Sequence, residues 1–433
     1  MYYFIGIKGS GMASLACILK DCGYEVCGSD IDKEIFIQKN LIEKNIPFYS
    51  FNKNNIKDGM NVIIGNAFDE THEEVKAALE NPTVTTYTYP QFLGYLVSQY
   101  HSICVCGTHG KTGTTGLLSH VMSFKNPTGY LIGDGTGYMP QDGKTFVLES
   151  CEYKRNFLNY YPDYTLLLNI ELDHVDYYKS MEDYLDAFET FANQAKKGVA
   201  LFGDEENTHK LNLNVEHMFY GISDKNDVYA KNIVEDKNGV SFDCYIRNAF
   251  FGHFELPFFG MHLLYNALGV ITIAYMNGIG AEVLQDSMST FEGVKRRFNI
   301  EEKSGNVYID DYAHHPTAIK CTIDAAKQKY PDMKLIAIFK PDRFSRIEYF
   351  LKDFKEAFKD ADEIYFCDFP ENQVREEGIT VTIEDLKNQV EGSVVIKEDE
   401  ESAEKLAKLG PAVYLFMSSK DIYKLKNKMK NFH

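Results

Sequence analysis

A short glycine-punctuated loop between an apolar run and an amphipathic segment is the feature that most constrains this chain. Residues 102–106 read SICVC, which favours a β-strand, and residues 107–112 read GTHGKT, which is rich in turn formers. Apolar residues then recur at helical spacing through 117–122. A strand, a tight loop and a helix in this order direct backbone N–H groups and a helix N-terminus at an anion. The pattern predicts a phosphate site.

The loop carries residue types that suit a nucleoside triphosphate. Lys111 would neutralise β- and γ-phosphate oxygens, and the hydroxyl of Thr112 is a suitable hard-oxygen ligand for Mg²⁺. The common pattern G-x-x-x-x-G-K-[ST] is incomplete, because Val105 occupies the position of its first glycine. From these residues alone, two interpretations remain open. The loop is either an ATP site or an ordinary strand–turn–helix with an exposed lysine.

Composition narrows the class of protein. A chain of 433 residues with 44% hydrophobic content is long enough for two to four globular domains. The net charge of −18 argues against a nucleic-acid or anionic-membrane surface. No basic leader and no apolar run near the roughly 18 residues of a membrane span are present, so we expect a cytoplasmic protein without membrane insertion. Nine scattered cysteines without a C-x-x-C pair indicate reduced thiols.

Strand and helix patterns alternate in three sections, which predicts three α/β domains in series. The first, 1–98, opens with a strand, a glycine turn, a helix and a second strand that ends in Ser29 and Asp30. Its glycines follow G-x-x-G-x-G, which disfavours a nicotinamide oxidoreductase. We expect a Rossmann-like domain there, a central parallel sheet of the P-loop ATPase type over 99–293, and a second Rossmann-like domain over 294–433.

Acidic and imidazole side chains follow two strands of the middle section. Glu149 closes the strand in TFVLES, and Asp173 and His174 follow TLLLNI. The carboxyl ends of parallel strands meet at the edge where the phosphate loop also lies. A lone Glu or His at such a place is usually a solvated loop residue, but three elements that converge on one edge favour a metal site.

Six motifs occur in the order and near the spacings of the Mur ligase family, which the chain resembles over essentially its whole length: GTHGKTGTT, LESCEYKRNFL, LLNIELDHVDYY, GMHLLYNAL, EGVKRRF and DDYAHHPTAI. The opening FIGIKGSGM and the segment DDYAHHP are typical of the branches that add the first amino acid to the peptidoglycan precursor or recycle muramyl peptides. The resemblance implies a UDP-binding domain, a central ATPase and a C-terminal domain that admits the amino acid.

The reaction that the resemblance implies uses ATP and Mg²⁺ to join L-alanine, or a related amine, to UDP-N-acetylmuramate. The substrate carboxylate attacks the γ-phosphorus, and an amine then displaces phosphate from the acyl phosphate. Lysine and magnesium would offset repulsion between the two anions, and closure of a separate domain would exclude water. A monomer or weak homodimer is expected.

The resemblance also assigns roles to individual residues. Four are expected to act directly in catalysis: Lys111, Glu149, His174 and Arg297. Metal ligation falls to Thr112, Glu149 and His174. Nucleotide contacts fall to Gly107, Thr108, Gly110, Lys111, Thr112, Asn266, Arg297 and Asp311. The UDP diphosphate and the incoming amino acid are assigned to Gly9, Ser10, Gly11 and Met12, with Ser29 and Asp30 nearby, and to Tyr312, Arg343 and Arg346.

The chain departs from the family pattern at four places. Leu263 replaces the first asparagine of G-x-H-N-x-x-N, Gly113 replaces a threonine, Asp342 replaces the histidine of P-H-R-x-x-R, and MSSKD at 417–421 replaces a glycine-containing motif. Leu263 affects the expected nucleotide network, and Asp342 affects the expected amine. Two alternatives therefore remain: a ligase for another amino acid or a muramyl peptide, and a weakly catalytic paralogue that binds nucleotide or UDP-sugar.

Overall fold

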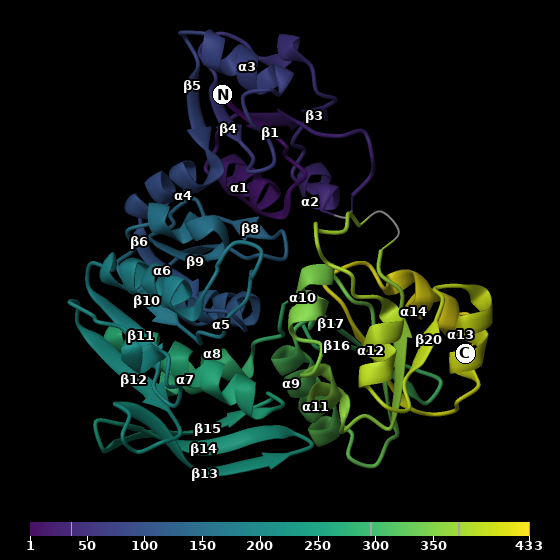
Figure 1. Ribbon diagram of the computed structural model, residues 1–433. Helices are drawn as coiled ribbons and strands as arrows, with labels where there is room; N and C mark the ends of the chain where they lie inside the picture. Colours follow the sequence, from purple (N-terminus) through teal and green to yellow (C-terminus); the bar gives the residue numbers. More distant parts are fainter. Residues whose placement is uncertain (36, 295–296, 371–372, 433) are drawn as a thin grey trace.

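The computed structural model describes residues 1–35, 37–294, 297–370 and 373–432, so Lys295 and Arg296 of the EGVKRRF motif lie outside the described residues. Within these ranges, three mixed or parallel sheets follow one another along the chain, each with its own helices (Figure 1). The expected fold class, three α/β units in series, is confirmed.

The N-terminal unit is a five-stranded parallel sheet in the order β3-β2-β1-β4-β5. Its strands are β1 (Tyr2–Ile5), β2 (Val26–Ser29), β3 (Phe48–Tyr49), β4 (Asn61–Ile64) and β5 (Thr85–Thr88). Its helices are α1 (Ser10–Asp21), α2 (Gln38–Glu43), α3 (Glu73–Glu80) and α4 (Tyr89–Ser98). Helix α1 is buried along its middle, and β8 of the next unit packs on it. The contact is close, because a Cβ added at Gly137 of β8 would lie 2.2 Å from the carbonyl oxygen of Ser14.

The central unit is a ten-stranded sheet in the order β15-β14-β13-β12-β11-β10-β6-β9-β7-β8. Its strands are β6 (His101–Cys106), β7 (Thr128–Leu131), β8 (Gly137–Tyr138), β9 (Thr145–Glu149), β10 (Tyr164–Leu167), β11 (Gly198–Phe202), β12 (His217–Gly221), β13 (Val228–Asp236), β14 (Gly239–Ile246) and β15 (Ala249–Leu256). Its helices are α5 (Lys111–Ser123), α6 (Met181–Asn193), α7 (Met261–Met276) and α8 (Ala281–Ser289). Strands β7, β9, β6, β10, β11, β12 and β13 are parallel, as expected.

Strands β13 to β15 extend this sheet as an antiparallel meander, which the sequence analysis did not predict. Burial alternates along β14, as it does when one face of a strand packs on the core. Arg247 and Asn248 both have positive φ, which is the backbone that a tight two-residue hairpin turn requires.

The C-terminal unit is a six-stranded sheet in the order β16-β17-β21-β18-β19-β20, parallel except for β16. Its strands are β16 (Asn299–Lys303), β17 (Asn306–Asp311), β18 (Leu335–Phe339), β19 (Glu363–Cys367), β20 (Val394–Ile396) and β21 (Val413–Met417). Its helices are α9 (Pro316–Lys329), α10 (Phe344–Tyr349), α11 (Phe354–Phe358), α12 (Ile383–Gln389), α13 (Glu400–Ala407) and α14 (Tyr423–Lys430). Helices α9 and α10 lie on the side of this unit that faces the central one (Figure 1).

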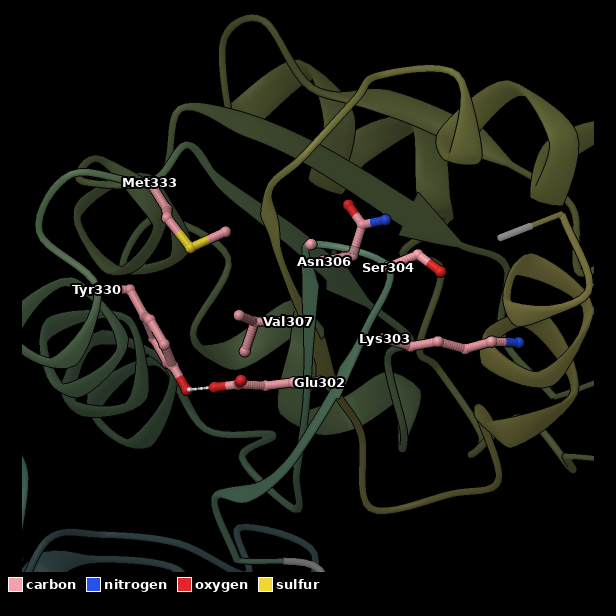
Figure 2. A pocket seen from close by; sticks show the side chains of 8 residues that line it. Glu302, Lys303, Ser304, Asn306, Val307, Tyr330 and Met333 are labelled. Atoms are coloured by element: carbon pink, nitrogen blue, oxygen red, sulfur yellow. Dashed lines mark hydrogen bonds between the residues drawn. The ribbon is translucent and has the colours of Figure 1, made fainter.

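An open hollow of about 300 Å³ lies at the β16–β17 turn, lined by residues 302–307, Tyr330 and Met333 (Figure 2). Glu302 accepts a hydrogen bond from the hydroxyl of Tyr330 across it at 3.1 Å. The residues assigned to nucleotide, metal or substrate lie elsewhere, so this hollow is not the candidate site. Among the described residues, no helix is long and apolar enough to cross a membrane.

Candidate nucleotide and substrate site

The glycine loop joins β6 to α5 as the sequence predicts. Gly107 (φ +133°) and Gly110 (φ +85°) adopt backbone conformations that L side chains rarely adopt. A Cβ added at Gly110 would lie 3.0 Å from the side-chain nitrogen of Asn266, so the residue expected to contact adenine packs against the loop. The loop therefore needs glycine both for its backbone and for the close approach of α7.

Lys111 forms an ion pair with a buried carboxylate that the sequence analysis did not single out. Its Nζ lies 2.9 Å from Oε2 of Glu152 and donates to the carbonyl oxygens of Gly107 and Thr108. The side chain of Glu152 is 1% exposed. Burial acts to raise the pKa of Glu152, but Lys111 and His174 outweigh it and lower the pKa below its ordinary value. Glu152 is therefore an ionised partner of Lys111, and its place in LESCEYKRNFL, three residues after Glu149, was the available signal.

Glu152 also contacts the candidate metal ligand His174. The Nε2 atom of His174 lies 3.3 Å from Oε1 of Glu152, while Nδ1 is buried and has no hydrogen-bond partner among the described residues. A proton on Nε2, which this contact favours, leaves the lone pair of Nδ1 free. The backbone of His174 is left-handed (φ +53°), a strained conformation that is common at functional sites. The orphaned nitrogen fits a metal ligand.

Thr112 and Glu149, the other two expected metal ligands, lie side by side. The Thr112 hydroxyl donates to Oε1 of Glu149 at 3.1 Å, and the amide of Gly133 donates to Oε2 at 2.6 Å. Burial raises the pKa of Glu149, against the opposing effect of Lys111. Two adjacent oxygen ligands are the donor set that Mg²⁺ prefers, so these residues fit the expected metal.

Arg297, at the start of the C-terminal unit, contacts the pair of Thr112 and Glu149 through Thr112. Its Nη2 donates to Oγ1 of Thr112 at 3.1 Å, and its guanidinium lies 4.9 Å from the ring centroid of Tyr312. Asp311, at the end of β17, accepts from the amides of Phe298 (2.8 Å) and Ala313 (2.7 Å). Burial raises the pKa of Asp311, and Arg297 opposes this shift. The structure therefore brings Arg297, Asp311 and Tyr312 together beside Thr112, one of the expected metal ligands.

Arg343 and Arg346 form ion pairs with the central unit. Arg346, almost fully buried, contacts Asp173 through Nε (3.3 Å) and Nη2 (3.2 Å). Arg343 contacts Asp176 at 3.3 Å and covers the ring of Tyr153. Both arginines thus reach the loop that carries His174, and the expected contact with an amino-acid carboxylate would have to replace or share these partners.

The glycine turn of the N-terminal unit is closed by Asp30. Gly9 precedes the first residue of α1, and Asp30 accepts from the amide of Lys8 at 2.7 Å. Met12, expected at the diphosphate, and Ser29, expected nearby, have buried side chains. Ser29 is fully buried and donates to Glu74, and the side chain of Met12 belongs to the hydrophobic core. These two side chains therefore pack beneath the turn, while Ser10 is partly exposed at the start of α1.

Models of one protein family match the three units in turn: Mur ligase family, catalytic domain (residues 1–101), Mur ligase middle domain (105–274), and Mur ligase, glutamate ligase domain (296–420). The chain belongs to the Mur ligase family.

Solved structures of Mur ligases share the fold over the whole chain. The UDP-N-acetylmuramate–alanine ligase of Thermotoga maritima is 22% identical, with a TM-score of 0.80 over 100% of this chain and 98% of that one. A murein peptide ligase of Psychrobacter arcticus is 22% identical, with a TM-score of 0.72 over 99% and 98%. A pseudomurein peptide ligase of Methanothermus fervidus is 19% identical, with a TM-score of 0.68 over 100% of both chains. At these identities the likeness shows the fold alone.

The structure shows the neighbours of two residues at which this Mur ligase departs from the family pattern. Asp342 is 6% exposed and accepts from Ser419 at 2.7 Å, with Lys420 at 3.6 Å. Its charge is thus compensated by the loop after β21, where MSSKD also departs from the pattern. A Cβ added at Gly113 would meet no atom within 4 Å, so space does not explain glycine there.

A second hollow, of about 510 Å³, lies in the N-terminal unit of this Mur ligase, near the ends of β3 and β4, and was missed by the sequence analysis. Phe51, Phe68 and His72 line it, with ring centroids 4.6 to 5.3 Å apart. The available signal was the aromatic residue that ends NVIIGNAF. Aromatic faces and edges suit a planar ring.

Proposed function

We propose that this Mur ligase is an ATP-dependent acid–amino-acid ligase that joins L-alanine to the carboxylate of UDP-N-acetylmuramate during peptidoglycan synthesis in the cytoplasm. The observation that carries the proposal is the arrangement of the phosphate loop. Lys111 is held by Glu152, the Thr112 and Glu149 oxygens lie together, and His174 presents an orphaned buried nitrogen.

The chemistry follows from the charges in this arrangement. A carboxylate oxygen attacks the γ-phosphorus of ATP, a P–O bond forms, and ADP leaves. An amine then attacks the acyl carbon, phosphate leaves, and the nitrogen loses a proton. Two anions must approach in the first step, and the ammonium of Lys111 and the guanidinium of Arg297 reduce their repulsion. Bound Mg²⁺ would add further positive charge, held by Thr112 and Glu149 in one site and by His174 in another.

Domain organisation supports the same proposal. We assign residues 1–98 to the UDP substrate, 99–293 to ATP, and 294–433 to the amine and to closure of the site. Arg297 already touches Thr112 across the boundary between the last two. Closure by a separate domain would exclude the water that hydrolyses an acyl phosphate. We expect a monomer or weak homodimer.

A muramyl peptide is the second candidate amine. Asp342 stands where the family pattern has histidine, and a murein peptide ligase shares the fold over nearly the whole chain. Phosphate release from ATP in the presence of UDP-N-acetylmuramate tests both candidates, with L-alanine, glycine, L-serine and short peptides as amines. The proposal predicts release that requires both the UDP-sugar and L-alanine. Release only with a peptide would select the second candidate, and binding without release would indicate a weakly catalytic paralogue.

A further inference from the structure

Two histidines and a glutamate from both the central and the C-terminal unit converge beside the phosphate loop. His109 belongs to the loop, Glu171 follows β10, and His315 precedes α9. One ligand atom from each lies within 4.8 Å of the others. Oε2 of Glu171 lies 2.9 Å from Nε2 of His109 and 3.9 Å from Nδ1 of His315. None of the three has a part in the proposed ligase chemistry.

Neighbouring groups hold these side chains in place. The hydroxyl of Thr317 donates to Oε1 of Glu171 at 2.8 Å, which leaves Oε2 to face both histidines. Asn169 accepts from the amide of His109 at 2.8 Å and donates to its carbonyl oxygen at 3.0 Å. His315 is 1% exposed and packs against the ring of Phe350. Outer contacts of this kind orient the ligands of a metal.

Each of the three side chains turns one ligand atom toward the others. His315 turns its Nδ1 toward Oε2 of Glu171, 3.9 Å away. Its Nδ1 accepts a long hydrogen bond, 3.4 Å, from the amide of Thr317 and therefore carries the lone pair. Oε2 of Glu171 also lies 2.9 Å from Nε2 of His109, close enough for the two atoms to share a proton. A cation bound between the three would displace the proton shared by His109 and Glu171 and take an electron pair from each side chain.

We propose that His109, Glu171 and His315 bind a divalent cation of the zinc class. Two imidazoles and one carboxylate suit Zn²⁺ and related transition metals, whereas Mg²⁺ prefers an all-oxygen set. The site differs from the two proposed magnesium sites, one at Thr112 and Glu149 and the other at His174. Because its ligands come from two units, the cation fastens α9 of the C-terminal unit to the phosphate loop.

Zinc titration of the full chain tests the site. The protein is stripped with a chelator, dialysed, and titrated calorimetrically with Zn²⁺ in excess Mg²⁺, which occupies the oxygen-ligand sites. We expect one Zn²⁺ per chain, and at least about tenfold weaker binding in Glu171→Gln and in His109→Gln. Glutamine at 171 can still accept from Thr317, so this variant keeps the surrounding contacts. His253→Gln is the matched control, because His253 pairs with Asp243 at 2.7 Å and lies 3.7 Å from Glu255 but joins no group of metal-ligand spacing among the described residues.

Hydrogen exchange tests the bridge between the units. Bound Zn²⁺ should slow amide exchange in residues 107–112 and in 313–320 together, in the wild type and in His253→Gln but not in the two ligand variants. Absence of saturable Zn²⁺ binding, equal binding by the ligand variants, or protection confined to one unit would each overturn the proposal. None of these readouts depends on ligase activity, so failure of the proposed function leaves this test intact.

Discussion

Glu152 joins the phosphate lysine and the candidate metal histidine through one buried carboxylate. Lys111 lies at 2.9 Å from one of its oxygens and His174 at 3.3 Å from the other. Removal of one member of a buried ion pair leaves an uncompensated charge and typically costs about 3–5 kcal/mol. The lysine of this loop therefore contributes to the stability of the chain as well as to the proposed chemistry.

We predict that Lys111→Ala lowers ligation by about a hundredfold or more, because a charge that acts in the transition state is lost. The same change should lower the thermal midpoint, since Glu152 loses its partner. The double variant Lys111→Ala, Glu152→Gln should recover stability without recovering activity. Thermal unfolding and phosphate release measure the two effects. Full activity in Lys111→Ala would contradict the assignment of Lys111 to ATP binding. An unchanged thermal midpoint would contradict its contribution to stability.

His262, near the start of α7, links stability to pH. Burial lowers its pKa to about 4, compared with about 6.5 in the unfolded chain. Between these values the unfolded state binds a proton that the folded state does not, so stability falls as pH decreases from about 6.5 to 4. The loss amounts to about 3 kcal/mol. Denaturant unfolding across this range should show a shallower pH dependence in His262→Asn, and an unchanged slope would contradict the assignment.

At the scale of elements, helix α5 shows how local space decides what a glycine does. Gly113 and Gly116 both lie in its first two turns. A Cβ at Gly113 would meet open space, whereas a Cβ at Gly116 would lie 2.3 Å from Cγ1 of Val294. Glycine inside a helix costs roughly 0.5–1 kcal/mol relative to alanine. The two positions therefore make a matched pair.

We predict that Gly113→Ala raises the free energy of unfolding by about 0.5–1 kcal/mol and leaves phosphate release unchanged. Gly116→Ala should instead destabilise the protein, because the stiff side chain of Val294 must move. Urea unfolding of both variants measures the difference. Equal effects at the two positions would show that helix propensity, rather than contact with Val294, decides the outcome.

Some of the helices and strands can be predicted from the sequence, and others cannot. The strands β1, β4, β6, β9, β10 and β17 and the helices α1, α5 and α9 were predictable, because apolar periodicity and glycine or proline signals mark them locally. The meander β13 to β15 was missed, since parallel and antiparallel neighbours are a property of the whole sheet. Glu149 and Thr112 were predictable from strand ends and the loop. Glu152 and the cluster of His109, Glu171 and His315 were not, because their contacts join segments far apart in the chain.

At the scale of the molecule, the C-terminal unit is attached to the central one by polar contacts. Arg346 pairs with Asp173, Arg297 reaches Thr112, and the side chain of Gln328 on α9 donates to the carbonyl oxygens of Asp236 and Gly239 at 2.9 Å. Interfaces of this polar kind permit relative domain motion more readily than large apolar ones. The arrangement suits a ligase that must open for substrates and close for chemistry.

Variants of Arg346 and Asp173 distinguish two roles of Arg346: attachment of the C-terminal unit to the central one, and recognition of the amine. If it also binds the carboxylate of the amino acid, Arg346→Lys should raise KM for L-alanine about tenfold or more, because lysine cannot reproduce the forked contact. Asp173→Asn removes the partner but keeps the guanidinium, so it should weaken attachment without raising that KM. We expect this divergence. KM and kcat for L-alanine, measured at saturating ATP and Mg²⁺ beside the thermal midpoint, decide the matter. If KM and the thermal midpoint changed in the same way in both variants, the role of Arg346 would be limited to attaching the two units.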